Sequence, residues 1–514
     1  MRTLHPSGTR PLYAQITETL QREIADGTLP AGTRLPSSRQ LAHDLHVSRI
    51  TVVTAYAELE AAGAIESRGG SGTYVLPPWT TSRPAGRGGE LSAALLAPEL
   101  PSWQCELMPM RSMEREQVLG HVLRGPLTPD TIGFAWGAGD PRLIPLSEFR
   151  RALVEVLDRD GAAALGPEGG AGYPPLRHWL ATYLRQNGLG VTPDDILITG
   201  GTQQTISLVA ATLLQSGDRV ITEMPTWPGA LEVFAAAGAR VIGIPLDEGG
   251  MQHDRLVDAL EHERPRLIYT VPTFQNPTGA VMGARRRLAL CTLAEQYGVP
   301  IFEDDHVREV RFGQPIPPPL AAFDRRGDVI HAGGFTKSLI PSLRIGYVVA
   351  RGPLREALMA RKRTADLFGS ALMQRTLWTF LESGAVARHW RRVSRIYHRR
   401  HTVMLLALER HFPPGSLWSG VSGGLVLWVR LPEGISVAAL HDAAAAAGVG
   451  FARGAAFFAE PADQPYIRLN FAAVDESEIE RGIAVLGRLV HDHLAVHPSR
   501  LNLPEPSQHS DGNV

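Results

Sequence analysis

Lysine is almost absent from this chain. Only Lys337 and Lys362 occur among its 514 residues, so arginine supplies the other 49 of the 51 basic residues. Arginine can replace a surface lysine, but not a lysine that must become a neutral nucleophile, because guanidinium stays protonated. Lys337 lies in a glycine- and hydroxyl-rich turn, residues 333–338, which favours an imine-forming lysine. Lys337 could also be a leftover of an arginine-rich composition, without a special role. That is our interpretation of Lys362, which stands between Arg361 and Arg363.

Cysteine, long apolar runs and net charge are scarce as well. The two cysteines, Cys105 and Cys291, are far apart and have no CxxC or Cys/His spacing, so neither a disulfide framework nor a structural metal site is supported. No uncharged apolar stretch reaches the ~18 residues that span a bilayer, and no signal-peptide pattern is present, so we expect a cytoplasmic protein without a membrane partner. The net charge of −1 excludes bulk electrostatic coating of nucleic acid and leaves room for a local basic surface.

The first 76 residues have a compact pattern of their own. An apolar residue at every fourth position from Leu12 to Ile24 predicts an amphipathic helix. Ser37 and Ser48 are placed to cap two further helices joined by a tight turn, which is a helix-turn-helix; the second ends at a glycine, residue 63. Residues 64–76 read as a β-hairpin with a glycine-rich tip, so the unit is winged. The inward face of the second capped helix is predicted to carry Val52, Val53, Tyr56 and Leu59.

The rest of the chain alternates short apolar runs with helical stretches. Residues 77–128 are rich in proline, glycine, serine and alanine and are predicted to form a linker. The alternation from residue 129 to 494 predicts a large α/β domain with a doubly wound sheet. Residues 495–514 are expected to be a disordered tail. Apolar runs predict strands at residues 196–199, 220–222, 241–244, 267–269, 301–302 and 329–330.

Several predicted strands are followed by polar or aromatic residues that suit one cofactor. Pyridoxal phosphate requires an imine-forming lysine, an acid at the ring nitrogen, a donor to the phenolic oxygen, an aromatic face and a phosphate cradle. Lys337 follows Asp304 by 33 residues, and Asn276 and Trp227 could supply the donor and the aromatic face. A glycine turn at residues 200–204 opens a helix whose amides could hold a phosphate. These segments meet in one crevice of a doubly wound sheet, so the sequence predicts a pyridoxal phosphate site.

Residues 129–490 resemble an aminotransferase domain of pyridoxal-phosphate fold type I. The matching runs are residues 134–145, 172–177, 201–204, 225–227, 275–279, 303–305, 336–337 and 468–471. The resemblance implies that Lys337 forms the internal aldimine, that Asp304 pairs with the ring nitrogen and that Arg468 takes a substrate carboxylate, which guanidinium binds through both oxygens. It also implies that Asn276 approaches the phenolic oxygen and that Trp227 stacks on the ring. The implied phosphate contacts are Gly201, Thr202, Gln203, Thr336 and Arg344.

Two positions depart from the pattern of that family. Its close relatives have tyrosine after the acidic pair, where this chain has His306, an imidazole that could donate to the phenolic oxygen. Five residues before Gly172 the family commonly has a tyrosine that touches the cofactor, and this chain has Pro167. Both departures bear on catalysis more than on cofactor binding.

Residues 9–76 resemble the winged helix-turn-helix of the GntR class, through the runs 11–16, 32–42, 47–52 and 70–75. Residues 1–76 contain seven arginines and seven acidic residues, so DNA binding depends on local clustering of the arginines. The alternative is a winged helix that binds another protein. The candidate DNA contacts are Ser48, Arg49 and Thr51 at the start of the recognition helix, Arg34 and Arg39 at phosphates, and Gly72 in the wing.

A GntR-type reader joined by a long linker to an aminotransferase-like domain resembles the MocR subfamily of transcription regulators. The resemblance implies a double-stranded DNA operator, a large domain that senses a small amino compound or pyridoxal phosphate itself, and a head-to-tail homodimer. Two alternatives stay open. One is a working aminotransferase with an incidental DNA-binding arm, which turnover would reveal. The other is a regulator without cofactor, against which Lys337 and Asp304 argue.

Overall fold

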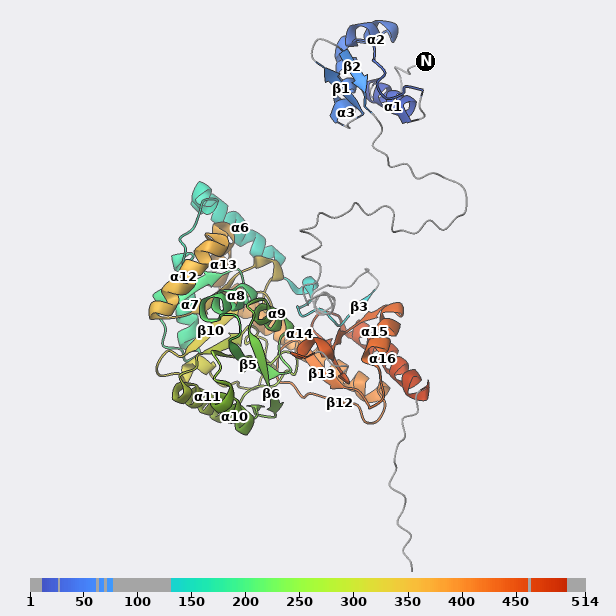
Figure 1. The fold of residues 1–514 in the computed structure, drawn as a ribbon. Helices are drawn as coiled ribbons and strands as arrows, with labels where there is room; N and C mark the ends of the chain where they lie inside the picture. Colours follow the sequence, from blue (N-terminus) through green and yellow to red (C-terminus); the bar gives the residue numbers. More distant parts are fainter. Residues whose placement is uncertain are drawn as a thin grey trace, which may run out of the picture. The chain divides into compact units, whose positions relative to one another are not determined.

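The computed structural model of the chain describes residues 12–25, 28–61, 64–68, 72–76, 131–460 and 464–496. The chain divides into two compact units, Met1–Cys105 and Glu106–Val514 (Figure 1). The predicted linker, residues 77–128, lies outside the described residues. So does the predicted tail, residues 495–514, except that its first two residues belong to the last helix, Glu476–Val496, so the predicted start of the tail is two residues too early. In the part of the chain that is described, no helix is both long and apolar enough to cross a membrane.

The first unit is a winged helix-turn-helix, as the sequence predicts. Both predicted caps are confirmed: the Ser37 hydroxyl accepts a hydrogen bond from the Gln40 amide, and the Ser48 hydroxyl accepts one from the Thr51 amide, each across 3.2 Å. The two strands pair antiparallel, with Ile65 opposite Val75. The elements are α1 (Leu12–Ala25), α2 (Ser38–Asp44), α3 (Arg49–Ala61), β1 (Ile65–Arg68) and β2 (Gly72–Val75).

The predicted inward face of α3 is wrong at one position. Val53 is 47% exposed, whereas Val52 and Leu59 are completely buried. An α-helix has 3.6 residues per turn, so a face that contains Val52 continues three and four residues later, at Ala55 and Tyr56. Both of these residues are buried in the core of the unit. The predicted helix stop at residue 63 and the wing tip at residues 69–71 lie outside the described residues.

The second unit is built on an eight-stranded sheet with the order β4-β11-β10-β9-β8-β5-β6-β7. The strands from β10 to β6 in this order run parallel, and all six predicted strands are present. The sequence analysis missed β11, which lies antiparallel between β4 and β10. The strands are β4 (Ile196–Thr199), β5 (Arg219–Met224), β6 (Arg240–Asp247), β7 (Gly250–Met251), β8 (Leu267–Thr270), β9 (Ile301–Asp305), β10 (Val329–Gly334) and β11 (Gly346–Val349).

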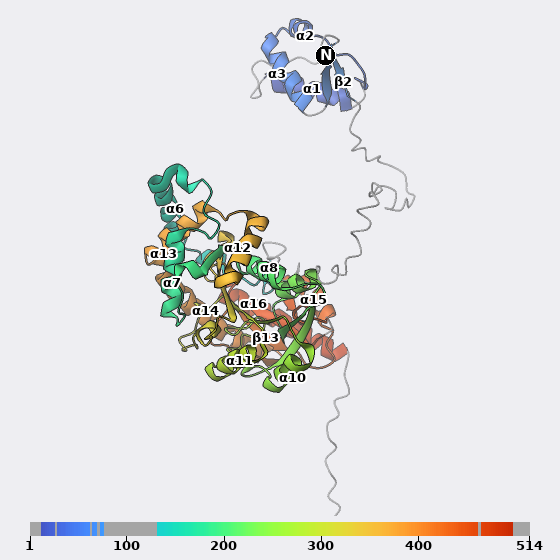
Figure 2. The same ribbon diagram turned by 60° about the vertical axis from the view of Figure 1, so that its left-hand side comes forward.

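Helices cover both faces of this sheet, which confirms the doubly wound α/β class (Figure 2). Neighbouring residues of a strand point to opposite faces, so Val220 packs with α8, α9 and α12, and Ile221 packs with α10 and α11. Helices α6, α7 and α13 pack at the β4–β11 edge. The bounds are α6 (Leu146–Asp160), α7 (Pro174–Gln186), α8 (Thr202–Leu213), α9 (Pro228–Ala236), α10 (His253–Glu263), α11 (Ala284–Tyr297), α12 (Gly352–Asp366) and α13 (Ala371–Glu382).

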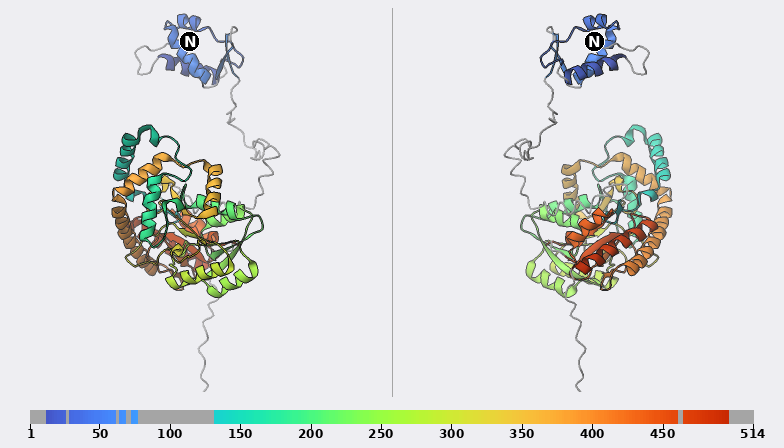
Figure 3. Two further views of the ribbon diagram at one scale, coloured as in Figure 1. Left: turned by 90° about the vertical axis from the view of Figure 1, so that its left-hand side faces the viewer. Right: turned by 90° about the vertical axis from the view of Figure 1, so that its right-hand side faces the viewer.

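A smaller C-terminal lobe completes the second unit, and the sequence analysis did not separate it from the large domain. Its antiparallel sheet has the order β12-β13-β16-β15, and α14 packs against α16, which is red in Figure 3. Strand β3 pairs with β14, so the first described residues of the unit join this lobe. The elements are β3 (Ile132–Gly133), α14 (Ala385–His411), β12 (Leu417–Trp418), β13 (Val426–Arg430), α15 (Val437–Ala446), β14 (Val449–Gly450), β15 (Ala452–Arg453), β16 (Tyr466–Asn470) and α16 (Glu476–Val496).

Candidate functional site

Lys337 lies in the loop after β10, at the carboxyl end of the parallel strands. Burial lowers the pKa of its amine to about 8; Arg468 and Arg344 act in the same direction, and Asp304 opposes them. Near neutral pH roughly a tenth of this amine is therefore uncharged. That is the state in which lysine attacks a carbonyl carbon, so the environment of Lys337 suits a nucleophile.

Asp304 lies on β9, the parallel neighbour of β10, and is 3% exposed. The predicted strand at residues 301–302 is longer in the structure, where β9 continues to Asp305. The Tyr269 hydroxyl donates a hydrogen bond to Oδ2 of Asp304 across 2.9 Å. Oδ1 is buried and has no hydrogen-bond partner among the described residues. A buried carboxylate oxygen without a donor is costly, so Oδ1 fits an external N–H such as that of a pyridinium ring.

His306, one of the two departures, lies beside the same carboxylate. Its Nδ1 is 3.3 Å from Oδ1 of Asp304, outside hydrogen-bond geometry, and its side chain is 16% exposed. The imidazole therefore neighbours the acid predicted to hold the ring nitrogen. Donation from His306 to the phenolic oxygen stays a prediction. Pro167, the other departure, is exposed in the segment before α7.

The backbone amides at the start of α8 lie next to an arginine side chain. Gly201 precedes the helix with a φ of +113°, a conformation that favours glycine, and no side chain caps the helix there. A Cβ atom on Gly201 would lie 3.4 Å from Nη2 of Arg344, so the guanidinium faces the helix start. Helix N-termini carry unsatisfied amides and favour anions. Gly201, Thr202 and Arg344 thus lie together, and Thr336 lies in the loop between β10 and Lys337.

Gln203 and Trp227 contact each other. The Trp227 indole donates from Nε1 to Oε1 of Gln203 across 3.1 Å, and Nε2 of Gln203 donates to the carbonyl of Gly229 across 2.7 Å. The Gln203 side chain is therefore engaged in orienting the indole at the start of α9. Its predicted contact with phosphate stays a prediction for this residue.

Arg468 lies on β16 of the smaller lobe and is completely buried, which lowers the pKa of its guanidinium. It donates to Oδ1 of Asn276 across 3.1 Å and to the carbonyl of Ala135 across 2.5 Å, while Nε has no partner among the described residues. A Cβ atom on Gly137 would lie 3.7 Å from both Nη2 of Arg468 and Nζ of Lys337. Arg468 and Lys337 therefore both lie close to Gly137, and Asn276 is joined to this pair through its hydrogen bond with Arg468.

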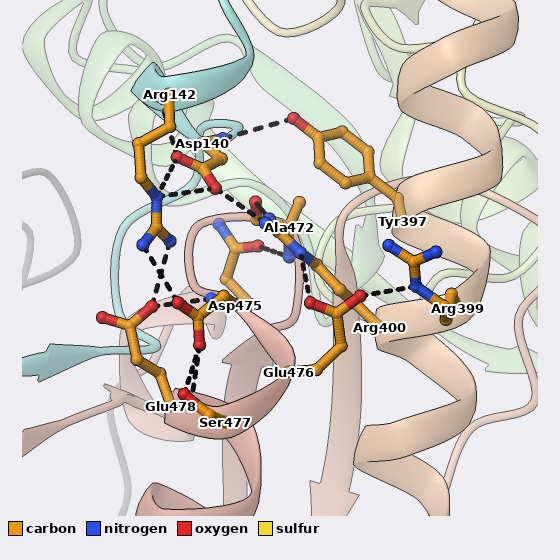
Figure 4. Close-up of polar contacts among 11 residues, drawn as sticks. Asp140, Arg142, Tyr397, Arg399, Arg400, Ala472, Asp475, Glu476, Ser477 and Glu478 are labelled. Atoms are coloured by element: carbon orange, nitrogen blue, oxygen red, sulfur yellow. Dashed lines mark hydrogen bonds and ion pairs between the residues drawn. The ribbon is translucent and has the colours of Figure 1, made fainter.

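The segment that carries Gly137 is anchored by an ion-pair network that the sequence analysis missed (Figure 4). Oδ2 of Asp140 accepts a hydrogen bond from Arg400 on α14 across 2.8 Å, and its Oδ1 accepts one from Arg142 across 2.9 Å. Arg142 also reaches Asp475 and Glu478 at the start of α16, at 3.1 and 3.0 Å. Except for Asp140 and Arg142, these partners are 260 or more positions apart in the chain, so no local pattern could reveal them.

The predicted DNA-contacting side chains of the first unit are largely exposed. Arg39 and Arg49 are exposed, and Nε of Arg49 donates to the Ser38 hydroxyl across 3.4 Å, which joins the starts of α2 and α3. The hydroxyls of Ser48 and Thr51 share a hydrogen bond of 2.8 Å. Exposed apolar residues of α3 were not among the predicted contacts: Ile50, at 78%, and Val53.

The wing is joined to the helix-turn-helix through Arg34. Its backbone forms a bridge with Tyr74 of β2, and a Cβ atom on Gly72 would lie only 2.6 Å from Nε of Arg34. Glycine at position 72 therefore lets the exposed guanidinium lie against the wing. The structure brings these two predicted DNA contacts together.

Comparison with known proteins gives matches for both units. Residues 12–75 match the gntR family of bacterial regulatory proteins, and residues 131–486 match aminotransferase class I and II. The HTH-type transcriptional regulator YdfD of Bacillus subtilis is 32% identical, covering 94% of this chain and 97% of that protein. The probable rhizopine catabolism regulatory protein MocR of Rhizobium meliloti is 33% identical over 92% of each chain.

Among solved structures, the α-aminoadipate aminotransferase LysN of Thermus thermophilus is similar to the second unit. Its crystal structure contains N-(5'-phosphopyridoxyl)-L-leucine. The two sequences are 33% identical, and the structures superpose with a TM-score of 0.69 over 74% of this chain and 98% of that chain. The regulators thus match across both units, whereas this enzyme leaves about a quarter of the chain unmatched.

Proposed function

The chain belongs to the MocR subfamily of GntR transcription regulators, and on that basis we propose that its second unit senses a small amino compound that carries a carboxylate. The protein is a DNA-binding transcription regulator with an aminotransferase-like domain that uses pyridoxal phosphate. Pyridoxal phosphate itself is the second candidate effector. A DNA-binding regulator acts where the DNA is, so we place it in the cytoplasm.

The residues around Lys337 fit the cofactor. Bound pyridoxal phosphate supplies a carbonyl carbon that reacts with amines and a ring that withdraws electrons. Lys337 would hold it through an amine that is partly uncharged near neutral pH, and Oδ1 of Asp304 would take the ring N–H. Because Tyr269 already donates to Oδ2, the carboxylate is oriented before the cofactor binds.

The other proposed contacts follow the placement of the side chains. Arg344 and the amides at the start of α8 would hold the phosphate, together with Thr202 and Thr336. Trp227, oriented by Gln203, would pack on the ring. Asn276 would donate to the phenolic oxygen, with His306 as a further donor.

Arg468 would select the effector. It is buried, and a buried guanidinium is stabilised by a carboxylate that it can bind through two parallel hydrogen bonds. Its present partners are both neutral oxygens, those of Asn276 and Ala135. An amino acid that places its amine near Lys337 could bring its carboxylate to this guanidinium.

The first unit would read DNA through the start of α3. Arg49, Ser48 and Thr51 lie at the end of the recognition helix that enters a major groove in this class. Arg34 and Arg39 would contact phosphates, and Gly72 would let the wing approach the neighbouring minor groove.

A head-to-tail homodimer is part of the proposal. Four apolar side chains are exposed on α6 and just after it, an arrangement that is costly in water and typical of a covered surface. They are Leu146, Val154, Leu157 and Leu165, exposed by 71%, 50%, 39% and 69%. A second copy of the chain is the proposed cover.

The sensing proposal rests on Oδ1 of Asp304, a buried oxygen near Lys337 that has no hydrogen-bond partner among the residues the structure describes. The test is a visible spectrum of the purified protein with pyridoxal phosphate, before and after each candidate amino acid, paired with operator binding under the same conditions. A working aminotransferase is the alternative, favoured by the near-complete site. Sustained conversion of an amino donor and a keto acid, with operator affinity unaffected by either, would favour the enzyme.

A further inference from the structure

The second lysine of the chain is not a surface leftover. Lys362 is 2% exposed on α12, whereas its neighbours Arg361 and Arg363 are both exposed. Its ammonium donates a hydrogen bond to Oδ1 of Asp366 across 2.8 Å. Burial of a charged amine is costly unless the charge is paired. The interpretation from composition is therefore wrong for Lys362, and its burial calls for a physical reason.

A series of hydrogen bonds leads from this lysine to the phosphate end of the site. Oδ2 of Asp366 accepts a hydrogen bond from Nε2 of Gln204 across 2.8 Å. Oε1 of Gln204 in turn accepts one from the amide of Gly200 across 2.6 Å. Gly200 immediately precedes Gly201, where α8 begins. Three hydrogen bonds thus connect Lys362 to the loop that presents the first amides of α8.

Helix stability does not account for this ion pair. Asp366 is the last residue of α12, where a carboxylate faces the negative end of the helix dipole. The order of the pair, lysine four residues before the acid, is also the weaker one on a helix. The Asp366 carboxylate is therefore unfavourable for its own helix, and its contact with Gln204 gives it a role outside that helix.

We infer that Lys362 is a positioning residue for the cofactor phosphate, acting through Asp366 and Gln204. The lysine orients the Asp366 carboxylate, and the carboxylate orients the side-chain amide of Gln204. The Gln204 side chain in turn holds Gly200 in place, so that the backbone amides at the start of α8 face an incoming anion. The positive charge of Lys362 also offsets the negative charge of Asp366, which would otherwise repel a phosphate at the start of α8. The inference rests on the proposed phosphate site at Gly201 and Arg344.

Two ligands that differ only in phosphate separate positioning from general structural support. Pyridoxal phosphate and pyridoxal would be titrated by absorbance into the full-length protein and into Lys362→Met. We expect the variant to bind pyridoxal phosphate about tenfold more weakly, the order of effect for lost hydrogen bonds to a charged group, with affinity for pyridoxal unchanged. Arg361→Met, an exposed change on the same helix, is the matched control and should leave both affinities unchanged.

An equal loss for the two ligands, or no loss for pyridoxal phosphate, would overturn the inference, as would the same selective loss in Arg361→Met. If Lys362→Met does not fold, Gln204→Met provides the same test, since it removes the side chain that contacts Gly200. If Gln204→Met kept the parent's ratio of pyridoxal phosphate affinity to pyridoxal affinity, the inference would be overturned. Failure of the parent protein to bind either ligand would contradict the proposed function instead.

Discussion

Arg468 and Asn276 are joined by a hydrogen bond of 3.1 Å between Nη1 and Oδ1. The first residue lies on β16 of the smaller lobe, and the second follows β8 of the main sheet. The proposed effector contact and a proposed cofactor contact are thus direct neighbours across the two lobes. A carboxylate that binds Arg468 competes with Asn276 for the guanidinium. A ligand changes the arrangement of lobes only if it binds two arrangements unequally, and this contact is one place where that difference can arise.

Replacement of Lys337 should abolish covalent capture of the cofactor. The Lys337→Arg variant keeps a positive charge but has no amine that loses its proton near neutral pH, so borohydride should leave no pyridoxyl group on the peptide that contains residue 337. Mass spectrometry of the digested protein checks this. A parent protein that takes up no pyridoxal phosphate would refute the assignment.

The rate of cofactor attachment should rise with pH, with a midpoint near pH 8. Because burial lowers the pKa of Lys337 from 10.5 to about 8, the uncharged amine reaches about half its maximum there, and the rate should level off above that pH. Asp304 raises this pKa, so Asp304→Asn should move the midpoint to lower pH. Stopped-flow absorbance between pH 6 and 10 measures both. A midpoint near 10.5 in the parent would contradict the buried environment of Lys337.

Loss of the Asp304 carboxylate should weaken cofactor binding, because the ring N–H would lose its acceptor. We expect Asp304→Ala to lower affinity for pyridoxal phosphate by at least tenfold, the usual cost of an unmade charged hydrogen bond. Tyr269→Phe removes only the donor to Oδ2 and should cost less. Equilibrium titration distinguishes the two variants. Equal affinities in Asp304→Ala and the parent would place the ring nitrogen elsewhere.

Arg468 should distinguish effectors by their carboxylate. The Arg468→Ala variant is expected to lose its spectral response to amino acids while keeping its response to simple amines, which have no carboxylate to bind. The comparison uses matched pairs, such as an amino acid and its decarboxylated amine, with the parent as control. If the variant responds to amino acids as the parent does, carboxylate capture lies elsewhere.

Two arginines of the first unit should affect DNA binding differently. Arg49→Ala should cost about 1–3 kcal/mol at the operator and relax base preference, because the residue opens the recognition helix. Arg39→Ala should weaken binding to all sequences alike and reduce its salt dependence, as expected for a phosphate contact. Fluorescence anisotropy at several salt concentrations measures both. Normal operator binding by the double variant would remove the DNA-binding roles of these residues.

Local sequence patterns were sufficient for the elements and for several residues near the site. Alternating apolar runs predicted six strands of the main sheet, and serines at the right spacing predicted the caps of α2 and α3, because these signals act within one turn or one strand. The scarcity of lysine singled out Lys337. Asp304 was placed near it because parallel strands end at one edge of a sheet.

Only the tertiary structure decided how distant segments meet. Nothing near Lys362 in the sequence indicates that α12 packs against α8 and buries this side chain, or that Asp366 meets Gln204, 162 positions earlier. The antiparallel insertion of β11 and the contact between Arg468 and Asn276, 192 positions apart, likewise depend on strand order and lobe packing. Such contacts are set by the global arrangement of elements. Local residue patterns predict the elements themselves, but they contain no information about which neighbours those elements acquire.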